Sequence, residues 1–133
     1  MKEISELKFP DDMKYNESHE WVKPGDTVRI GITDYAQDQL GDIVFVELPQ
    51  EGESFAKGEE FATVESVKAV CECYMPVGGK IVAANRALED SPELINSNPY
   101  KDGWMVEVAP DDLSEMDTLM TRDACLEKLK GAE

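Results

Sequence analysis

The stretch that decides the fold spans residues 61–74 and reads FATVESVKAVCECY. Two Pro-x-x-Gly turns, at residues 49–52 and 76–79, lie on either side of it, and Pro and Gly at such spacing are typical of turns between strands. Apolar residues recur with a period of two on both sides of its middle, which indicates strands with one buried face. We therefore predict two strands joined by a tight turn that exposes Lys68.

The part of the chain before residue 49 predicts a hairpin, a short helix and a further strand. Residues 20–22 and 27–32 flank the sequence KPGD at 23–26, which predicts a hairpin. Thr33 is expected to cap a short helix that ends at Gly41. The run IVFV at 43–46 is continuously apolar, and this predicts a central strand that is covered on both faces.

The C-terminal part predicts one more strand, at 104–108, followed by two helices. Asp111 or Asp112 is expected to cap the first helix, and Thr121 the second. No linker rich in Pro, Ser or Gly divides the chain. We predict one mainly-β domain over residues 1–133, with its core at about 14–109 and C-terminal helices at about 111–130. Helical spacing is seen at Leu113, Met116, Leu119 and Met120, and again at Cys125, Leu126 and Leu129.

The charge balance limits the partners. With 13 Lys and Arg against 29 Asp and Glu, the chain of 133 residues has a formal net charge of -16. Nucleic acid and anionic membrane attract clustered Lys and Arg, so neither is expected as a partner. An acidic surface suits basic patches on other proteins. The apolar runs are too short to span a membrane.

The location and the redox state follow from the N-terminus and the cysteines. The first residues offer neither a signal peptide nor an Arg-rich transit peptide. An odd count of 3 cysteines argues against a secreted disulfide framework. We therefore expect a cytoplasmic protein.

Residues with catalytic or metal-binding chemistry are scarce. His19 is the only histidine, which excludes a multi-histidine metal site. The sequence contains no phosphate-binding glycine loop and no nucleophile elbow. We expect neither catalytic residues nor a metal site.

Lys68 is the position that stands out. It lies between apolar Val67 and Ala69 in an otherwise acidic stretch. A lysine at the tip of a hairpin is accessible to a modifying enzyme. Conversion of its amine to an amide would remove the positive charge, and the uncharged product would suit the apolar neighbours. A solvated lysine at a strand end is the simpler alternative.

Several stretches agree in order and spacing with a known family over roughly residues 7–125. They are SHEWV at 18–22, GITDYAQ at 31–37, LGDIVFVELP at 40–49, ESVKA at 65–69, LIN at 94–96, PY at 99–100 and GW at 103–104. With these stretches the chain resembles the H-proteins of the glycine cleavage system, which carry covalent lipoic acid. The resemblance implies a barrel-sandwich hybrid, a mainly-β lipoyl-carrier fold with short helices and a helical C-terminal segment, and it places the lipoyl group on Lys68.

The resemblance also implies a shuttle without catalysis of its own. An H-protein receives an aminomethyl group from the glycine decarboxylase P-protein and passes it to the aminomethyltransferase T-protein. The dihydrolipoyl dehydrogenase L-protein then reoxidises the arm, and a lipoate-attaching enzyme installs it. A tethered arm meets these sites at high effective concentration. We expect a monomer.

A docking cleft for the loaded arm is implied beside Ser18 and Glu20, with Glu72 as a second candidate. His19 could orient Glu20 or simply pack. Cys71 and Cys73 stand where small polar or apolar residues are expected in the family. On one strand their Cα atoms would lie about 6.6 Å apart, too far for an unstrained disulfide. Since Glu72 has the wrong sign to activate a thiol, inert strand residues are favoured over redox partners of the arm.

The sequence also allows functions other than that of a glycine cleavage shuttle. One is an H-protein-like paralogue that acts in lipoate relay or redox defence. Another is an acidic scaffold in which Lys68 is never modified. A biotin carrier would place methionines beside its lysine, unlike Val67 and Ala69, and a lipoyl domain of a dehydrogenase complex would be followed by a linker and a catalytic domain.

Overall fold

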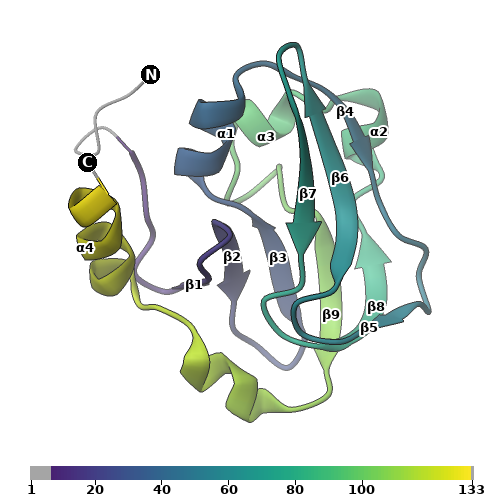
Figure 1. Cartoon of the computed structure of the whole chain (residues 1–133). Coiled ribbons are helices and arrows are strands. Elements are labelled where there is room, and N and C mark those ends of the chain that lie inside the picture. Colours follow the sequence, from purple (N-terminus) through teal and green to yellow (C-terminus); the bar gives the residue numbers. More distant parts are fainter. Residues whose placement is uncertain (1–6, 133) are drawn as a thin grey trace.

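The computed structural model describes residues 7–132, which form two antiparallel sheets and a few short helices (Figure 1). The larger sheet has six strands in the order β1-β2-β3-β9-β8-β5, and the smaller has three in the order β4-β6-β7. The strands are β1 (Lys14–Tyr15), β2 (Glu20–Lys23), β3 (Val28–Ile32), β4 (Ile43–Glu47), β5 (Ser54–Phe55), β6 (Glu60–Ser66), β7 (Val70–Tyr74), β8 (Gly79–Ala84) and β9 (Val106–Pro110). The helices are α1 (Asp34–Leu40), α2 (Ala87–Asp90), α3 (Leu94–Ser97), the 3-10 helix η2 (Leu113–Thr118) and α4 (Arg122–Ala132).

The main core lies between the two sheets. Val22 and Ile30 of the larger sheet and Val64 of the smaller sheet are fully buried in one apolar cluster. Alternate residues of β3, Val28, Ile30 and Ile32, join this cluster, as the period of two predicts. The predicted mainly-β, barrel-sandwich class of fold is therefore confirmed.

Two predicted local structures form as expected. Strands β2 and β3 pair as a hairpin in which Trp21 lies opposite Gly31. The Thr33 hydroxyl accepts a hydrogen bond of 3.2 Å from the Ala36 backbone N–H and so caps α1. Helix α1 ends at Gly41, whose φ of 80° suits glycine.

The prediction of a central strand at 43–46 was wrong. Strand β4 lies at an edge of the smaller sheet, and the side chains of Val44 and Phe45 are 53% and 48% exposed. A shift in pairing between Ile43 and Phe45 marks a bulge, which turns these side chains outward. Composition alone cannot distinguish such an edge strand from a buried one.

The C-terminal part also differs from expectation. The first predicted helix is the 3-10 helix η2, capped by Asp112, and Leu113 is 62% exposed. Strand β9 begins at Val106, two residues later than predicted. Helix α4 forms after Thr121 as expected, because the Thr121 hydroxyl accepts a hydrogen bond of 3.3 Å from the Ala124 N–H.

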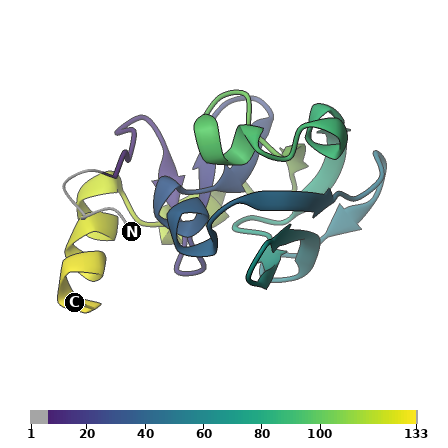
Figure 2. The ribbon, with the colours of Figure 1, turned by 90° about the horizontal axis from the view of Figure 1, so that it is seen from above.

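Helix α4 extends the molecule beside β1, away from the β6–β7 hairpin (Figures 1 and 2). Cys125 and Leu129 pack there in a second apolar cluster with Phe9, Met13 and Tyr15. Within residues 7–132, no helix has the length and apolar character needed to cross a membrane.

Candidate functional site

Lys68 lies exposed at the tip of the hairpin that joins β6 to β7 (Figure 1). The turn is closed by a hydrogen bond of 2.8 Å from the Ser66 backbone N–H to the Ala69 carbonyl. The Ser66 hydroxyl also accepts hydrogen bonds from the N–H groups of Lys68 at 3.3 Å and Ala69 at 3.0 Å. The lysine thus extends from a defined turn rather than from a mobile loop.

A second segment supports this tip. The Val67 N–H donates a hydrogen bond of 3.1 Å to the carbonyl of Asp42, at the junction of α1 and β4. Lys68 Cε lies 3.6 Å from the position that a Cβ atom on Gly41 would occupy. The side chain of the lysine therefore leans over the end of α1.

Asn96 of α3 fixes the junction on which the tip rests. Its amide group donates hydrogen bonds of 2.9 Å to the Gly41 carbonyl and to Gln37 Oε1. Its Oδ1 accepts a hydrogen bond of 2.9 Å from the Ile43 N–H. The sequence reasoning assigned no role to Asn96, because its partners lie more than fifty residues away in the chain.

Glu20 is a buried carboxyl group at the start of β2, only 1% exposed. Asn16 Nδ2 donates a hydrogen bond of 2.8 Å to Glu20 Oε1, and the Glu20 N–H donates one of 2.8 Å to Asn16 Oδ1. Burial raises the pKa of Glu20 to about 8, against the opposing effect of hydrogen bonds from Asn16 and the Tyr74 backbone. The contact with Tyr74 places Glu20 near the end of β7 that is remote from Lys68.

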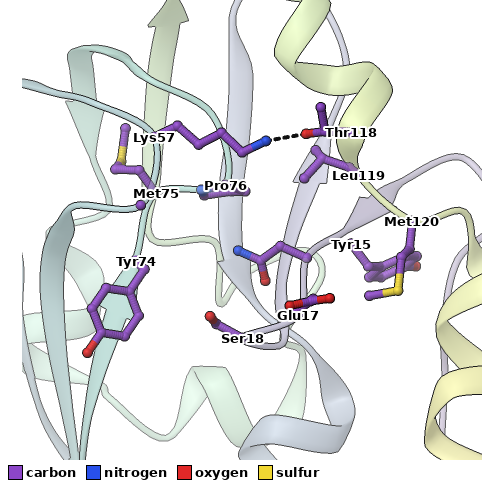
Figure 3. A pocket seen from close by; sticks show the side chains of 12 residues that line it. Tyr15, Glu17, Ser18, Lys57, Tyr74, Met75, Pro76, Thr118, Leu119 and Met120 are labelled. Atoms are coloured by element: carbon purple, nitrogen blue, oxygen red, sulfur yellow. Dashed lines mark hydrogen bonds between the residues drawn. The ribbon is translucent and has the colours of Figure 1, made fainter.

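Ser18 lies exposed beside a hollow of about 320 Å³ near that same end of β7 (Figure 3). Tyr74 also lines the hollow, and the Lys57 side chain extends along another side of it to the Thr118 hydroxyl. Much of the remaining lining is apolar, with Met75, Pro76, Leu119 and Met120. Asn16 also lines the hollow, so it connects the hollow with the buried Glu20.

Two further predicted residues do not join Glu20. Glu72 is exposed, between the inward-facing Cys71 and Cys73, and so points to the other face of β7. His19 has a positive φ of 68° and packs on the ring of Tyr35, with ring centroids 4.7 Å apart. Asn16, rather than His19, is hydrogen-bonded to Glu20. The spacing of four residues between Asn16 and Glu20 was the signal that sequence reasoning overlooked.

Cys71 and Cys73 lie on the inner face of β7, as their spacing predicts. Cys71 is partly exposed, and Cys73 is fully buried. A hydrogen bond from the Cys73 thiol lowers the pKa of Cys71 to about 7, against burial and the charge of Glu72. The charge of Glu72 raises the pKa of Cys71, as its sign predicts, but the opposing effect of the neighbouring thiol is larger.

Among residues 7–132, no group of three or more His, Cys, Asp or Glu side chains could hold a metal ion. The arrangement instead offers an exposed primary amine on a rigid turn, an apolar hollow and a buried carboxyl group. These features fit an acyl group attached to Lys68 and folded back along β7.

Comparisons with known proteins agree over nearly the whole chain. The family described as Glycine cleavage H-protein matches residues 13–132. A glycine cleavage system H protein of Bacillus licheniformis is 57% identical over 116 residues, which are 86% of this chain and 91% of that protein. A probable glycine cleavage system H protein of Haloarcula marismortui is 53% identical over 122 residues, which are 91% of this chain and 96% of that protein.

A solved structure shows the same fold. The crystal structure of a glycine cleavage system H protein from Mycobacterium marinum superposes with a TM-score of 0.83 at 39% sequence identity. The match covers 92% of this chain and 99% of that one. On the sequence, the fold and these relatives together, the chain belongs to the glycine cleavage H-protein family.

Proposed function

We propose that the protein is a lipoyl carrier of the glycine cleavage system and that Lys68 bears the lipoyl group. The observation that carries this proposal is the position of Lys68, exposed in the ESVKA stretch at the tip of a hydrogen-bonded hairpin. An exposed amine is open to a lipoate-attaching enzyme, and acylation removes its charge. Val67 and Val70, 71% and 58% exposed, offer apolar surroundings that suit the uncharged amide.

Bound to Lys68, a lipoyl group would supply a disulfide that opens when an aminomethyl group is taken up and that the L-protein would restore by oxidising the resulting dithiol. The chain holds this group on a tether at a fixed point, which gives it a high effective concentration at each partner. The partners we propose are the P-protein, the T-protein and the L-protein. In this scheme the chain itself catalyses no step.

The distance along β7 matches the length of such a tether. About twelve bonds separate Lys68 Cα from the ring sulfur of a lipoyl group, a reach of about 14 Å at the spacing of an extended chain. Strand β7, from Val70 to Tyr74, spans about 13 Å. Because Lys68 lies two residues before this strand, such an arm reaches along most of β7, toward the hollow beside Ser18 and toward Glu20.

Glu20 and Ser18 are the residues that we propose receive the loaded arm. With its pKa raised to about 8, Glu20 holds a proton at neutral pH while the cleft is empty. An ammonium group beside it would favour the carboxylate, so docking should release that proton from Glu20. Because Glu72 points to the other face of β7, the geometry supports Glu20 and Ser18 rather than Glu72.

The negative net charge of the chain supports a role as a carrier that binds to several partner enzymes. A net charge of -16 would steer the carrier toward basic entrances on partner enzymes and disfavours nucleic acid and anionic membranes. We further propose a monomeric carrier that works as one domain. The three free cysteines fit a reducing compartment, and we propose the cytoplasm.

Lipoylation of the purified chain tests the proposal. Incubation with lipoate, ATP and a lipoate ligase should add one lipoyl group, found by peptide mapping on Lys68. The Lys68→Arg variant should gain none and should fold normally, because arginine keeps the charge but lacks an acylatable amine. A lipoyl group on another lysine, or none on the wild type, would overturn the assignment. Incubation of the lipoylated protein with glycine and the P-protein then distinguishes the two roles. A carrier of the glycine cleavage system should take up the aminomethyl group, whereas a paralogue with another role should not.

A further inference from the structure

We propose that the unpaired edge of β7 binds the amide group that acylation creates on Lys68, with the Val70 backbone N–H as the donor to the amide carbonyl oxygen. This site rests on the proposed function, because it needs an acyl group on Lys68. It adds the backbone group that holds the base of the arm. Acylation and the contact at Val70 are measured separately, so a failure of either can be recognised.

Strand β7 pairs with β6 and lies at an edge of the smaller sheet. The ladder between them starts at the turn, where the Ser66 N–H donates a hydrogen bond of 2.8 Å to the Ala69 carbonyl. It ends where the Met75 N–H donates one of 2.9 Å to the Glu59 carbonyl. Because hydrogen-bonded residues alternate along an antiparallel pair, the odd-numbered residues of 69–75 direct their backbone groups to β6.

The even-numbered residues Val70, Glu72 and Tyr74 direct their backbone groups away from β6, and all three are exposed. The Tyr74 N–H donates to the buried Glu20 carboxyl group. Within residues 7–132, no protein group accepts a hydrogen bond from the N–H of Val70 or of Glu72. An unpaired edge of this kind is a template for another amide or strand, and its free donors lie between Lys68 and Glu20.

Lys68 extends toward this edge. Its Cε lies 3.6 Å from the position that a Cβ atom on Gly41 would occupy, at the end of α1, and Figure 1 shows α1 on the side of β7 opposite β6. About five bonds join Lys68 Cα to Nζ, a reach of about 6 Å. The Cα atom of Val70 is about 7 Å away or less, whereas Glu72 lies about 6.6 Å further along the strand. An amide on Nζ therefore reaches the Val70 N–H but not the Glu72 N–H.

Acylation changes what Lys68 can bind. The free ammonium group only donates hydrogen bonds, whereas an amide carbonyl accepts them. The Val70 N–H is itself a donor, so it cannot bond to the free lysine and can bond to the acylated one. The amide is also uncharged, which suits its position beside the exposed side chains of Val67 and Val70. The contact should therefore form only after acylation.

The charge of the chain favours the arm over a second copy at this edge. Two copies that paired through β7 would bring the Glu72 side chains close together, and like charges across a strand pair are destabilising. Each copy also has a net charge of -16, which opposes association. An amide tethered two residues away meets the edge at high effective concentration without such repulsion.

The bond at Val70 would set the direction of the arm. With the amide held there, the rest of an acyl chain starts along β7 toward the hollow beside Ser18. A chain already held in this direction loses less conformational freedom when its end docks. Val70 is therefore a positioning residue for the docked arm, and it acts through its backbone.

Amide exchange in the wild-type chain is the first test. Unacylated, octanoylated and lipoylated proteins are prepared with a lipoate ligase, and intact mass establishes that one acyl group is present. In deuterium exchange followed by NMR, the Val70 N–H should exchange about two- to tenfold more slowly in both acylated proteins, as one hydrogen bond of ordinary strength implies. The Glu72 N–H should change little. Octanoate forms the same amide without sulfur, so protection by the lipoyl group alone would indicate a contact of the ring and contradict the proposal.

Lys68→Met is the matched control, because it removes the charge of Lys68 without supplying a carbonyl. Its Val70 N–H should exchange as in the unacylated wild type; slower exchange would attribute the protection to the lost charge and overturn the role of the amide. Equal exchange in acylated and unacylated wild type would refute the site and leave Lys68 as the acylated residue. Protection that rises with protein concentration would identify a second copy as the occupant instead. If intact mass shows no acyl group, the proposed function fails, and this site with it.

Proline substitution removes single donors from the edge. Proline is tolerated where a strand N–H points away from its partner, so Val70→Pro and Glu72→Pro each lose an unpaired N–H and no ladder bond. With octanoate labelled with carbon-13 at its carbonyl, the NMR signal of the wild-type amide should differ from that of free octanoyl-lysine. Val70→Pro should move the signal to the free position, and Glu72→Pro should leave it in place. The same result in both variants would overturn the assignment to Val70; if Val70→Pro does not fold, the exchange of the wild-type Val70 N–H decides.

Discussion

Asn16 makes two hydrogen bonds of 2.8 Å to Glu20. Its Nδ2 donates to Oε1 of the buried carboxyl group, and its Oδ1 accepts from the Glu20 backbone N–H. The pair fixes the direction of a carboxyl group that has almost no contact with solvent. The hydrogen bonds that the carboxylate receives from Asn16 and from the Tyr74 backbone do not replace the hydration that it has lost. Glu20 therefore has a fixed orientation, and its pKa of about 8 keeps it mostly protonated at neutral pH.

The free energy of unfolding should depend on pH through the titration of Glu20. Its pKa rises from 4.5 in the unfolded chain to about 8 in the fold, so the native state binds the proton more tightly. The resulting stabilisation is fully present below pH 4.5 and is lost as pH rises toward 8. Its upper limit is about 5 kcal/mol.

The Glu20→Gln variant removes this titration and keeps the shape of the side chain. In urea unfolding at pH 5, 6, 7 and 8, the variant should gain stability relative to wild type as pH rises. His19, whose burial lowers its pKa, contributes an opposite slope that is common to both proteins and cancels in the difference. Glu72→Gln, on the exposed face of β7, is the matched control and should show no such trend. Parallel curves for Glu20→Gln and wild type would show that Glu20 titrates normally.

The same variant should loosen the hold on a loaded arm. A hydrogen bond to a charged group contributes about 1.5–3 kcal/mol, so the docked fraction should fall roughly ten- to a hundredfold in Glu20→Gln. Lipoylation at Lys68 should be unchanged. The measurement is the half-life of the isolated aminomethylated protein at pH 7 and low salt.

The control for arm retention is Glu47→Gln, an exposed carboxyl group on β4. Its half-life should match that of wild type. If Glu20→Gln also matches wild type, Glu20 is a structural residue of the first hairpin and the shelter lies elsewhere along the hollow.

Asn96 should control the rigidity of the tip. Asn96→Ala removes three hydrogen bonds at the junction of α1 and β4 and leaves buried partners unsatisfied, at a cost of about 1–3 kcal/mol. The Val67 N–H, which bonds to Asp42 at that junction, should then exchange with deuterium faster. Ser97→Ala, on the exposed side of α3, should leave the exchange unchanged; faster exchange in both variants would point to loss of α3 as a whole.

The sequence predicted the parts of the site that depend on neighbours in the chain. The turn at Lys68 and the shared face of Cys71 and Cys73 follow from strand periodicity over a few residues. Contacts between distant segments could not be derived in that way. One example is the hydrogen bond from Asn96 to the Gly41 carbonyl, and another is the exposure of Phe45 on β4. Both depend on which elements become neighbours in space, and local apolar patterns do not determine those neighbours.

Gly31 should tolerate no larger side chain, because a Cβ atom there would lie 2.8 Å from the Trp21 ring. Trp21 is fully buried, and its Nε1 donates a hydrogen bond of 3.1 Å to the Pro99 carbonyl, so the ring has little room to move. Overpacking of this kind costs about 1–3 kcal/mol, and Gly31→Ala should lower the unfolding free energy in urea by that amount.

A double-mutant cycle with Trp21→Phe identifies the cause of this loss. The smaller ring should relieve the clash, so the double variant should be more stable than the sum of the single changes by about 1 kcal/mol or more. Strictly additive losses would mean that Gly31 is required by its backbone rather than by the ring opposite. Lys68 lipoylation should persist in all three variants under folding conditions, because the pair lies in the β2–β3 hairpin and not at the β6–β7 tip.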